Sequence, residues 1–338
     1  MPDDAQKLRW RLRQLGISDP AVKAAWPGWW SDDAAGSTSA SLELRFSVAR
    51  KLGLDPRSLG EEGQPRFVWR DEGKFKHLST QNEVERSAIG SFGAAISRAL
   101  VAGTKPGPSI ENLPAQELRK VILASQQFVR LVDLIGLCWG TGIPVIFLRI
   151  FPLAAKRMCA MTVRVGDRFA ILLGKESKYP APIAFYIAHE LAHAALGHLR
   201  DGLAIVDLED PLEEAAETDE EELAADRYAL ELLTGQPDPI VTTRARRFTA
   251  PQLAANLLQT GAAMRIEPGT LALCFGYSTG QWAKANAAMK RIYADALPAW
   301  AEINRTAHQQ LDWSAISDDL ASFVRAVMGP IDDAHSRH

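Results

Sequence analysis

Residues 183–198 read IAFYIAHELAHAALGH and lie within a longer apolar stretch. From Ala181 to Gly197, the side chains with polar groups are Tyr186, His189, Glu190 and His193. A helix that is apolar on all sides is typical of a buried element, so this stretch predicts a helix in the interior of the protein. Burying two imidazoles and a carboxylate is unfavourable unless each finds a partner, which indicates a polar site inside the fold.

The spacing of these polar residues indicates a metal site. His189 and His193 are four residues apart, so both project from one face of the helix, one turn apart. Two ring nitrogens then converge, as a tetrahedral metal site requires. Glu190 lies about 100° around the helix from His189, where it can reach a water molecule at the metal without being a ligand. This is the HExxH pattern of zinc hydrolases, although the bare pattern also arises by chance in helices whose histidines bond to a neighbouring loop.

A second stretch, EEELAADRYALELL at 220–233, predicts another helix that carries acids into apolar surroundings. Glu222 and Asp226 are four residues apart and share one face of it. Glu222 can complete a His, His, Glu donor set, and Asp226 can accept the free N–H of a ligand histidine. The alternative is that both belong to a solvated charge run, because residues 207–222 contain ten acids and no Lys or Arg.

His198 is another candidate for the third ligand. It lies nine residues after His189, about 180° away around the helix, and follows Gly197, a residue typical of helix ends. A role at the helix end or as an outer contact of the site is therefore favoured for His198. The metzincin class is excluded, because its glycine and its third histidine correspond to Leu196 and Leu199 here.

The sequence around these helices predicts an α+β protein that is mostly α. Three short runs rich in β-branched and apolar residues predict a small three-stranded sheet packed on the HExxH helix: PVIFLRI at 144–150, CAMTVRV at 159–165 and FAILLG at 169–174. Gly166-Asp167 is typical of a hairpin turn between the last two runs. Residues 116–138 have apolar side chains at helical spacing and predict one long helix.

Segments that contain Gly and Pro predict the boundaries of three domains. Residues 102–114, AGTKPGPSIENLP, read as a linker. We therefore expect a helical N-terminal domain at 1–105, a zinc metallopeptidase core at 106–236 and a helical C-terminal domain at 237–338. Within the first domain, LELRFSVARKLGLDPRSL at 42–59 resembles the closing helix of phage-repressor-type helix-turn-helix domains. The domain is either a degenerate helix-turn-helix that contacts DNA or a unit for packing or partner binding, and the second reading is favoured.

HELAH at 189–193, ELAAD at 222–226 and ALELL at 229–233 together resemble the ImmA/IrrE family of zinc metallo-endopeptidases. AILLGKES at 170–177 matches the way that this family enters its zinc helix from a strand. The resemblance covers about residues 115–235. It implies a gluzincin-like core and a substrate of the kind that several members cleave, a helix-turn-helix repressor encoded nearby.

By the same resemblance, His189, His193 and Glu222 hold Zn²⁺, Glu190 is the general base, and Asp226 contacts a ligand histidine from outside. The chain departs from the family in having Asp226 where Asn is also common, and Ala192 where many members have Gly. Neither departure removes a functional group.

These observations lead to two hypotheses of function. The first is a zinc-dependent endopeptidase, a hydrolase that cuts a regulatory protein such as a repressor or an antitoxin and thereby affects transcription. Its substrate is expected to pair as a strand with an exposed edge of the sheet. The alternative is a DNA-binding transcriptional regulator whose zinc site is structural or sensory. An intact Glu190 separates them, because a structural site has no use for a base beside the metal.

The amino-acid composition indicates the general class of protein. The chain has 338 residues, 47% hydrophobic and 23% charged, with a net charge of −3, as is usual for globular proteins. This excludes a disordered, a collagen-like or a small disulfide-rich protein. No run of 18 uncharged apolar residues occurs, and the amino terminus lacks the apolar segment of a secretion signal. Three scattered cysteines are typical of a reducing compartment, so we expect a cytoplasmic protein with no membrane partner.

Overall fold

The computed structural model of the protein describes residues 4–60, 65–69, 73–76, 83–154, 158–199, 204–207, 219–245, 247–293 and 298–330. Its helices are α1 (Asp4–Gln14), α2 (Asp19–Ala25), α3 (Thr38–Leu52), α4 (Glu83–Ala102), α5 (Ala115–Leu123), α6 (Leu131–Gly140), α7 (Pro180–Leu196), α8 (Glu220–Thr234), α9 (Ala250–Met264), α10 (Pro268–Thr279), α11 (Trp282–Ile292), α12 (Ala299–Gln310) and α13 (Asp318–Met328). Its strands are β1 (Gly73–Lys76), β2 (Val145–Phe147), β3 (Ala160–Val165), β4 (Arg168–Leu173) and β5 (Ala204–Asp207). The predicted α+β, mostly α class is confirmed.

The strands form one mixed sheet in the order β1-β5-β3-β4-β2. β3 and β4 are an antiparallel hairpin around Gly166, whose φ is 66°, so the predicted turn is confirmed. The predicted count of three strands is wrong, because β5 pairs with β3 and β1 pairs with β5. Both extra strands have only four residues. β1, GKFK, has no run of apolar residues, and β5 has only three, at 204–206. β5 then leads directly into the acidic segment, whose residues 208–218 lie outside the described part.

The sheet separates two hydrophobic layers, because successive side chains of a strand point to opposite faces. Met161 and Leu172 pack with α4, and the position of Gly93 on α4 has no room for a side chain beside Met161. On the other face, Ile171 and Ile205 pack with α7. All of α7 from Ala181 to Ala195 is buried, as predicted for this helix. α7 therefore lies between the sheet and the helices that surround it.

Residues 116–138 do not form one helix, so this expectation is wrong. α5 ends at Leu123, and α6 begins after Arg130, where the Asp133 carboxylate accepts a bond from the Arg130 backbone N–H. The Arg265 guanidinium donates to the carbonyl oxygens of Leu123 and Gln126 at 2.6 and 2.7 Å. These bonds satisfy carbonyls that a continuing helix would have used. α5 packs against α8, whereas α6 packs against α7 and α12.

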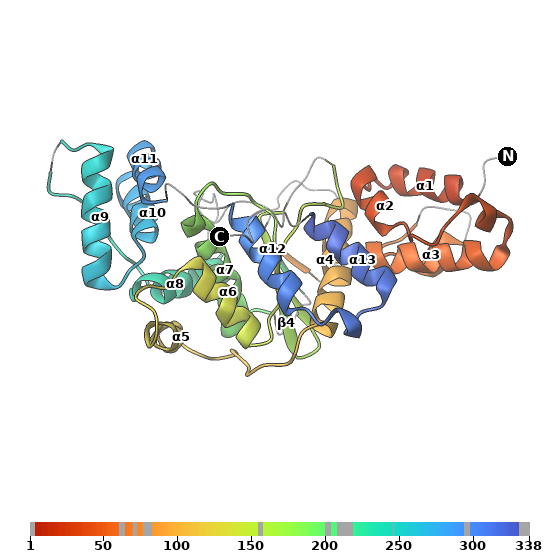
Figure 1. Ribbon diagram of the computed structural model, residues 1–338, viewed down its shortest axis with the longest axis horizontal. Coiled ribbons are helices and arrows are strands. Elements are labelled where there is room, and N and C mark those ends of the chain that lie inside the picture. Colours follow the sequence, from red (N-terminus) through yellow and green to blue (C-terminus); the bar gives the residue numbers. More distant parts are fainter. Residues whose placement is uncertain are drawn as a thin grey trace.

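The molecule is elongated, with α1–α3 at one end, α9–α11 at the other and the sheet in the middle (Figure 1). α9–α11 have a core of their own, which includes Leu257, Phe275 and Met289. α12 and α13 return to the sheet and to α4. One buried cluster thus contains residues from all three predicted domains, among them Leu44 and Phe323. The division at 105 and 236 stays a prediction.

One edge of the sheet is closed by α12. The side-chain oxygen of Asn304 accepts from the Phe147 N–H at 2.7 Å, and its amide nitrogen donates to the carbonyl oxygens of Phe147 and Met328 at 2.9 and 2.7 Å. Asn304 is fully buried and satisfies the backbone of β2 as a neighbouring strand would. A substrate strand therefore cannot pair with Phe147 without displacing α12.

The helix that resembles part of a helix-turn-helix, α3, is anchored by a buried lysine. Lys51 is 1% exposed and donates to Asp319 of α13 at 2.6 Å and to the Ala25 carbonyl at 3.0 Å. Burial lowers the pKa of Lys51, and the hydrogen bond to Asp319 opposes this shift. α3 is thus held against α2 and α13, while contact of this region with DNA stays a prediction. Among the described helices, none combines the length and apolar character that crossing a membrane requires.

Candidate metal centre

The ends of α7 follow from its sequence. Pro180 occupies the first helical position, where its missing N–H costs no hydrogen bond. Gly197 ends the helix in the left-handed conformation, with φ at 75°. The stretch between them places His189, Glu190 and His193 in the interior, at 1%, 0% and 0% exposure. The predicted polar site is therefore present, and it is buried.

The rings of His189 and His193 face one another through their Nε2 atoms. The Nε2 atoms of His189 and His193 are 3.0 Å apart. Each ring is held from behind through Nδ1, which lies 2.9 Å from Asp226 Oδ1 in His189 and 2.9 Å from His198 Nδ1 in His193. Holding Nδ1 fixes the ring orientation and directs Nε2 to the shared point.

Glu222 reaches this point from α8. Asp219 caps the helix by accepting from the Glu221 N–H at 2.9 Å, so Glu222 stands in the first turn. The partial positive charge of a helix N-terminus stabilises a carboxylate there. Glu222 is 7% exposed, and its carboxylate oxygens lie 3.1 Å from His189 Nε2 and 3.6 Å from His193 Nε2. α7 and α8 pack along one another, which brings together residues that are 29 to 37 positions apart in the chain.

His189, His193 and Glu222 form a group that could hold a metal ion, with donor atoms all within 4.8 Å of one another. In a tetrahedral zinc site with Zn–N distances near 2.0–2.1 Å, the ligand atoms lie about 3.3 Å apart. The distances of 3.0, 3.1 and 3.6 Å between the donors here bracket that value. Three lone-pair donors at this spacing repel one another unless a cation or a proton lies between them. The donor set therefore fits a divalent metal of the zinc type.

The two outer contacts correspond to residues that the sequence singled out. Asp226 contacts His189 from α8, which is the position predicted for it. His198 is 2.9 Å from His193 and does not belong to the three-donor group. The structure thus places His198 as an outer contact of His193, the reading that helix geometry favours, and Glu222 among the donors.

Glu190 has a partner that the sequence did not reveal. The hydroxyl of Thr162, a fully buried residue of β3, donates to the Glu190 carboxylate Oε2 and lies 3.1 Å from its backbone oxygen. Thr162 faces α7 beside the apolar side chains of Ile171 and Ile205 on the neighbouring strands. Its signal in CAMTVRV is weak, because threonine is common in strands for steric reasons alone.

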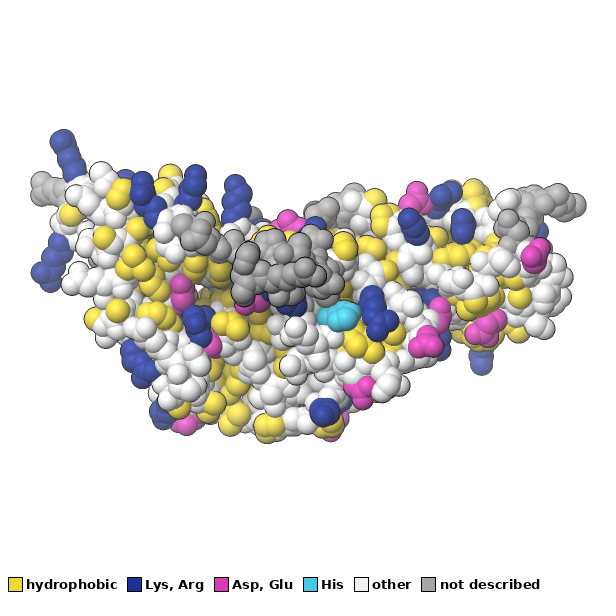
Figure 2. Space-filling model, viewed as in Figure 1, with side chains coloured by type: hydrophobic (Ala, Val, Ile, Leu, Met, Phe, Trp, Pro, Cys, Tyr) yellow, Lys and Arg dark blue, Asp and Glu magenta, His cyan; other side chains and the backbone are white. Residues whose placement is uncertain are grey.

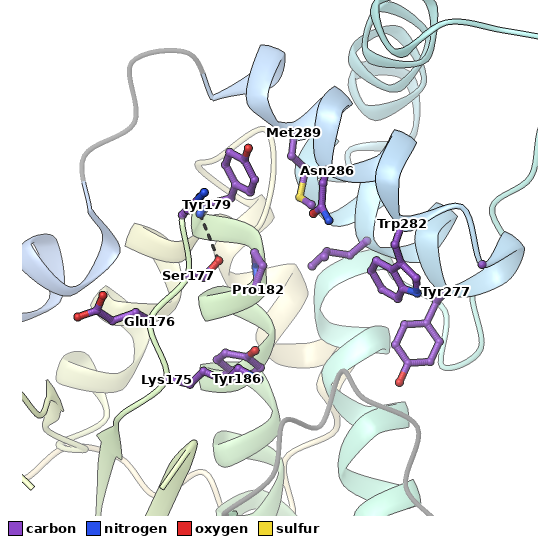
Figure 3. A pocket seen from close by; sticks show the side chains of 13 residues that line it. Lys175, Glu176, Ser177, Tyr179, Pro182, Tyr186, Tyr277, Trp282, Asn286 and Met289 are labelled. Atoms are coloured by element: carbon purple, nitrogen blue, oxygen red, sulfur yellow. Dashed lines mark hydrogen bonds between the residues drawn. The ribbon is translucent and has the colours of Figure 1, made fainter. Parts of the chain in front are cut away.

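Two pockets adjoin the centre. One of about 820 Å³ is lined in part by Pro182 and Tyr186 of α7 and by residues of α10 and α11 (Figure 3). The other, of about 240 Å³, is mainly apolar and includes Phe185 and Asp226 in its lining. Both open beside the helix that carries the histidines.

Cysteine chemistry finds no support here. Cys138, Cys159 and Cys274 are buried and form no disulfide with one another, as predicted. Burial raises the pKa of the Cys138 thiol well above its usual range and that of Cys274 to about 12. Neither is a thiolate near neutral pH, and the thiolate is the nucleophile.

Comparison of the chain with protein-family models, with curated proteins and with solved structures found no match.

Proposed function

We propose that the protein is a zinc-dependent endopeptidase of the kind suggested by the resemblance to the ImmA/IrrE family. One observation carries the proposal: a buried His, His, Glu donor group lies next to a buried carboxylate, Glu190, that is not part of the group. Metal-dependent hydrolysis of a peptide bond combines a Lewis acid with a general base. The expected substrate is a regulatory protein, such as a helix-turn-helix repressor or an antitoxin.

The proposed chemistry assigns a role to each side chain. A zinc ion bound by the three donors would supply Lewis acidity to the peptide carbonyl and to water. Glu190 takes a proton from the attacking water and delivers it to the departing amine, so the proton count balances. Asp226 and His198 keep the ligand rings in place. Thr162 keeps the Glu190 carboxylate in one orientation.

The alternative, a DNA-binding regulator with a structural or sensory zinc, is less well supported. Structural zinc sites generally use four protein ligands, whereas catalytic sites use three and leave a position open. Within the described residues the donor group has three members. A fully buried carboxylate with its own hydrogen-bond donor adds nothing to a structural site and is costly to bury.

The direct test is hydrolysis of candidate substrates with and without metal. Repressor-like proteins encoded near the gene would be incubated with purified protein, with protein dialysed against EDTA, and with dialysed protein given one equivalent of Zn²⁺. We expect cleavage in the first sample, none in the second and recovery in the third, measured by intact-protein mass spectrometry. Cleavage that persists undiminished after complete metal removal would show that the hydrolysis does not depend on this centre.

Replacing Thr162 with valine tests whether its hydroxyl positions Glu190. Valine has nearly the same shape, so the fold and bound metal should be retained, while the Glu190 carboxylate loses its donor. A misplacement of a catalytic group by about 1 Å can cost on the order of 100-fold in rate. We therefore expect kcat to fall by about tenfold or more, with recovery in Thr162→Ser, which restores a hydroxyl. Equal kcat in the valine and serine variants would assign Thr162 to packing alone.

A further inference from the structure

The pocket of about 820 Å³ lies between two walls that come from distant parts of the chain. One wall is the segment 175–179, which joins β4 to α7, together with Pro182 and Tyr186 of α7. The other wall consists of residues from α10, α11 and their connection: Leu273, Tyr277, Gly280, Trp282, Asn286 and Met289. Figure 3 shows the labelled side chains of the two walls on opposite sides of the opening. The volume lies in the range of about 300–1,000 Å³ that ligand sites occupy.

The pocket and the two donor histidines lie along the same face of α7, although none of the three donors lines the pocket. Pro182, Tyr186, His189 and His193 follow one another at spacings of four, three and four residues, so they form one stripe on a single face of the helix. Pro182 and Tyr186 line the pocket, and the two histidines supply metal donors. Because a helix rises 1.5 Å per residue, Tyr186 and His189 are separated by about 4.5 Å along the axis. The pocket lining thus reaches to within about one helical turn of the first donor.

The charge of the pocket is positive. Its lining includes Lys175 and Lys178 and a single acid, Glu176. Glu176 forms an ion pair with Arg149, outside the pocket, and points away from Trp282 and Asn286 on the other wall (Figure 3).

The side chains of the other wall are uncharged, but the helices α9–α11 around it carry more basic than acidic residues. Residues 250–292 contain four Lys or Arg and one acid, Glu267, which is buried at the start of α10. Figure 2 shows Lys and Arg side chains gathered over the end of the molecule that α9–α11 form, with few acids among them on the visible face. Such a surface attracts an acidic ligand and repels a basic one.

The other side chains that line the pocket are of kinds that can bind a polypeptide. Tyr186, Tyr277 and Trp282 offer flat apolar surface with a polar atom at the edge, against which an extended chain can pack. Asn286 presents both a donor and an acceptor, as a peptide group requires. The apolar pocket of about 240 Å³ shares Leu273 and Tyr277 with this one. An apolar side chain of the bound polypeptide can therefore enter the smaller pocket.

We infer that this pocket binds the substrate polypeptide and selects segments in which Asp or Glu lies near an apolar residue, an inference that rests on the proposed peptidase function. Lys175 and Lys178 contact the acidic side chain, and the rings of Tyr277 and Trp282 pack against the peptide backbone. The segment thus lies along α7 with its scissile bond beyond Tyr186, towards His189.

Binding can be measured without catalysis, which separates this inference from the proposed function. The probe is a fluorescein-labelled octapeptide of Ala, Leu, Phe and Ser with two Glu residues, matched by the same peptide with Lys at those two positions. Fluorescence polarisation with metal-free full-length protein at low salt should give at least tenfold tighter binding of the acidic peptide. Lys178→Glu, an exposed substitution, should weaken binding of the acidic peptide by about fivefold, the upper end for one exposed ion pair, and improve binding of the basic one.

Lys23→Glu is the matched control, because Lys23 is an exposed lysine of α2 at the other end of the molecule. It should change the affinity of either peptide by less than twofold. Equal affinity of the two peptides, or equal effects of the two substitutions, would overturn the inference. So would tighter binding of a single-stranded oligonucleotide than of the acidic peptide, since aromatic and basic groups also serve that ligand.

The outcomes remain distinguishable from those of the proposed function. If the acidic peptide binds as expected but zinc-loaded protein cleaves no candidate substrate, the pocket assignment holds and the peptidase proposal fails. If zinc-dependent cleavage occurs but Lys178→Glu leaves kcat/KM for acidic and basic peptides unchanged, the peptidase proposal holds and the pocket assignment fails.

Discussion

Glu222→Ala is expected to remove the metal from the protein. The substitution leaves two protein donors, His189 and His193, on one helix, and two ligands do not hold zinc at ordinary protein concentrations. The fold should survive, because Glu222 lies in the first turn of α8 and alanine is compatible with a helix. Metal analysis after dialysis should give close to one zinc per wild-type chain and almost none in the variant. Glu220→Ala, an exposed neighbour in the same turn, is the matched control and should keep full zinc.

Two further variants rank the contacts around the same centre. Asp226→Ala and His198→Ala each remove the group that holds one ligand ring through Nδ1. Losses of this kind typically weaken metal binding by 10- to 100-fold, so both proteins should still bind zinc when it is supplied in excess. Full zinc in Glu222→Ala together with an empty His198→Ala would contradict the donor set and indicate a three-histidine site.

The donor residues were predictable because helix geometry is local. Four residues along a helix bring side chains to one face whatever the rest of the chain does, so His189 with His193 and Glu222 with Asp226 could be paired from their spacing. The packing of α7 on α8 then brings the two pairs together. The meeting of the two pairs could not be predicted from spacing. It was predicted from chemistry, because buried polar side chains require partners.

The features that the sequence did not reveal depend on distant contacts. The break between α5 and α6 is fixed by Arg265, which lies 142 residues from Leu123 in the chain. β5 is recognisable as a strand once β3 lies beside it, because four residues carry too little pattern alone. Asn304 of α12 bonds to the backbone of β2 and to Met328 of α13, and periodicity cannot predict these bonds. Thr162 likewise acquires its role only from the helix packed above it.

Glu190→Gln is expected to abolish cleavage while leaving the protein folded and loaded with metal. Glutamine is nearly isosteric with glutamate, and the Thr162 hydroxyl can donate to its amide oxygen as it does to the carboxylate. Glu190 is not among the three donors, so zinc content should match the wild type. An amide cannot accept the proton of the attacking water, and loss of a general base costs about 10²- to 10⁴-fold in rate. Single-turnover cleavage of an identified substrate, with zinc content measured on the same sample, gives both quantities.

A control variant tests whether the loss of any one negative charge is enough to slow cleavage. Glu117→Gln removes an exposed carboxylate of α5 that pairs with Lys120, and its cleavage rate should equal that of the wild type. A Glu190→Gln protein that cleaves as fast as this control would show that Glu190 is not the base. Slow cleavage with full zinc and an unchanged melting temperature would instead argue against a structural metal, because a metal that only holds the fold has no rate to lose. The buried carboxylate beside the first ligand is thus the residue on which the peptidase and regulator hypotheses differ most.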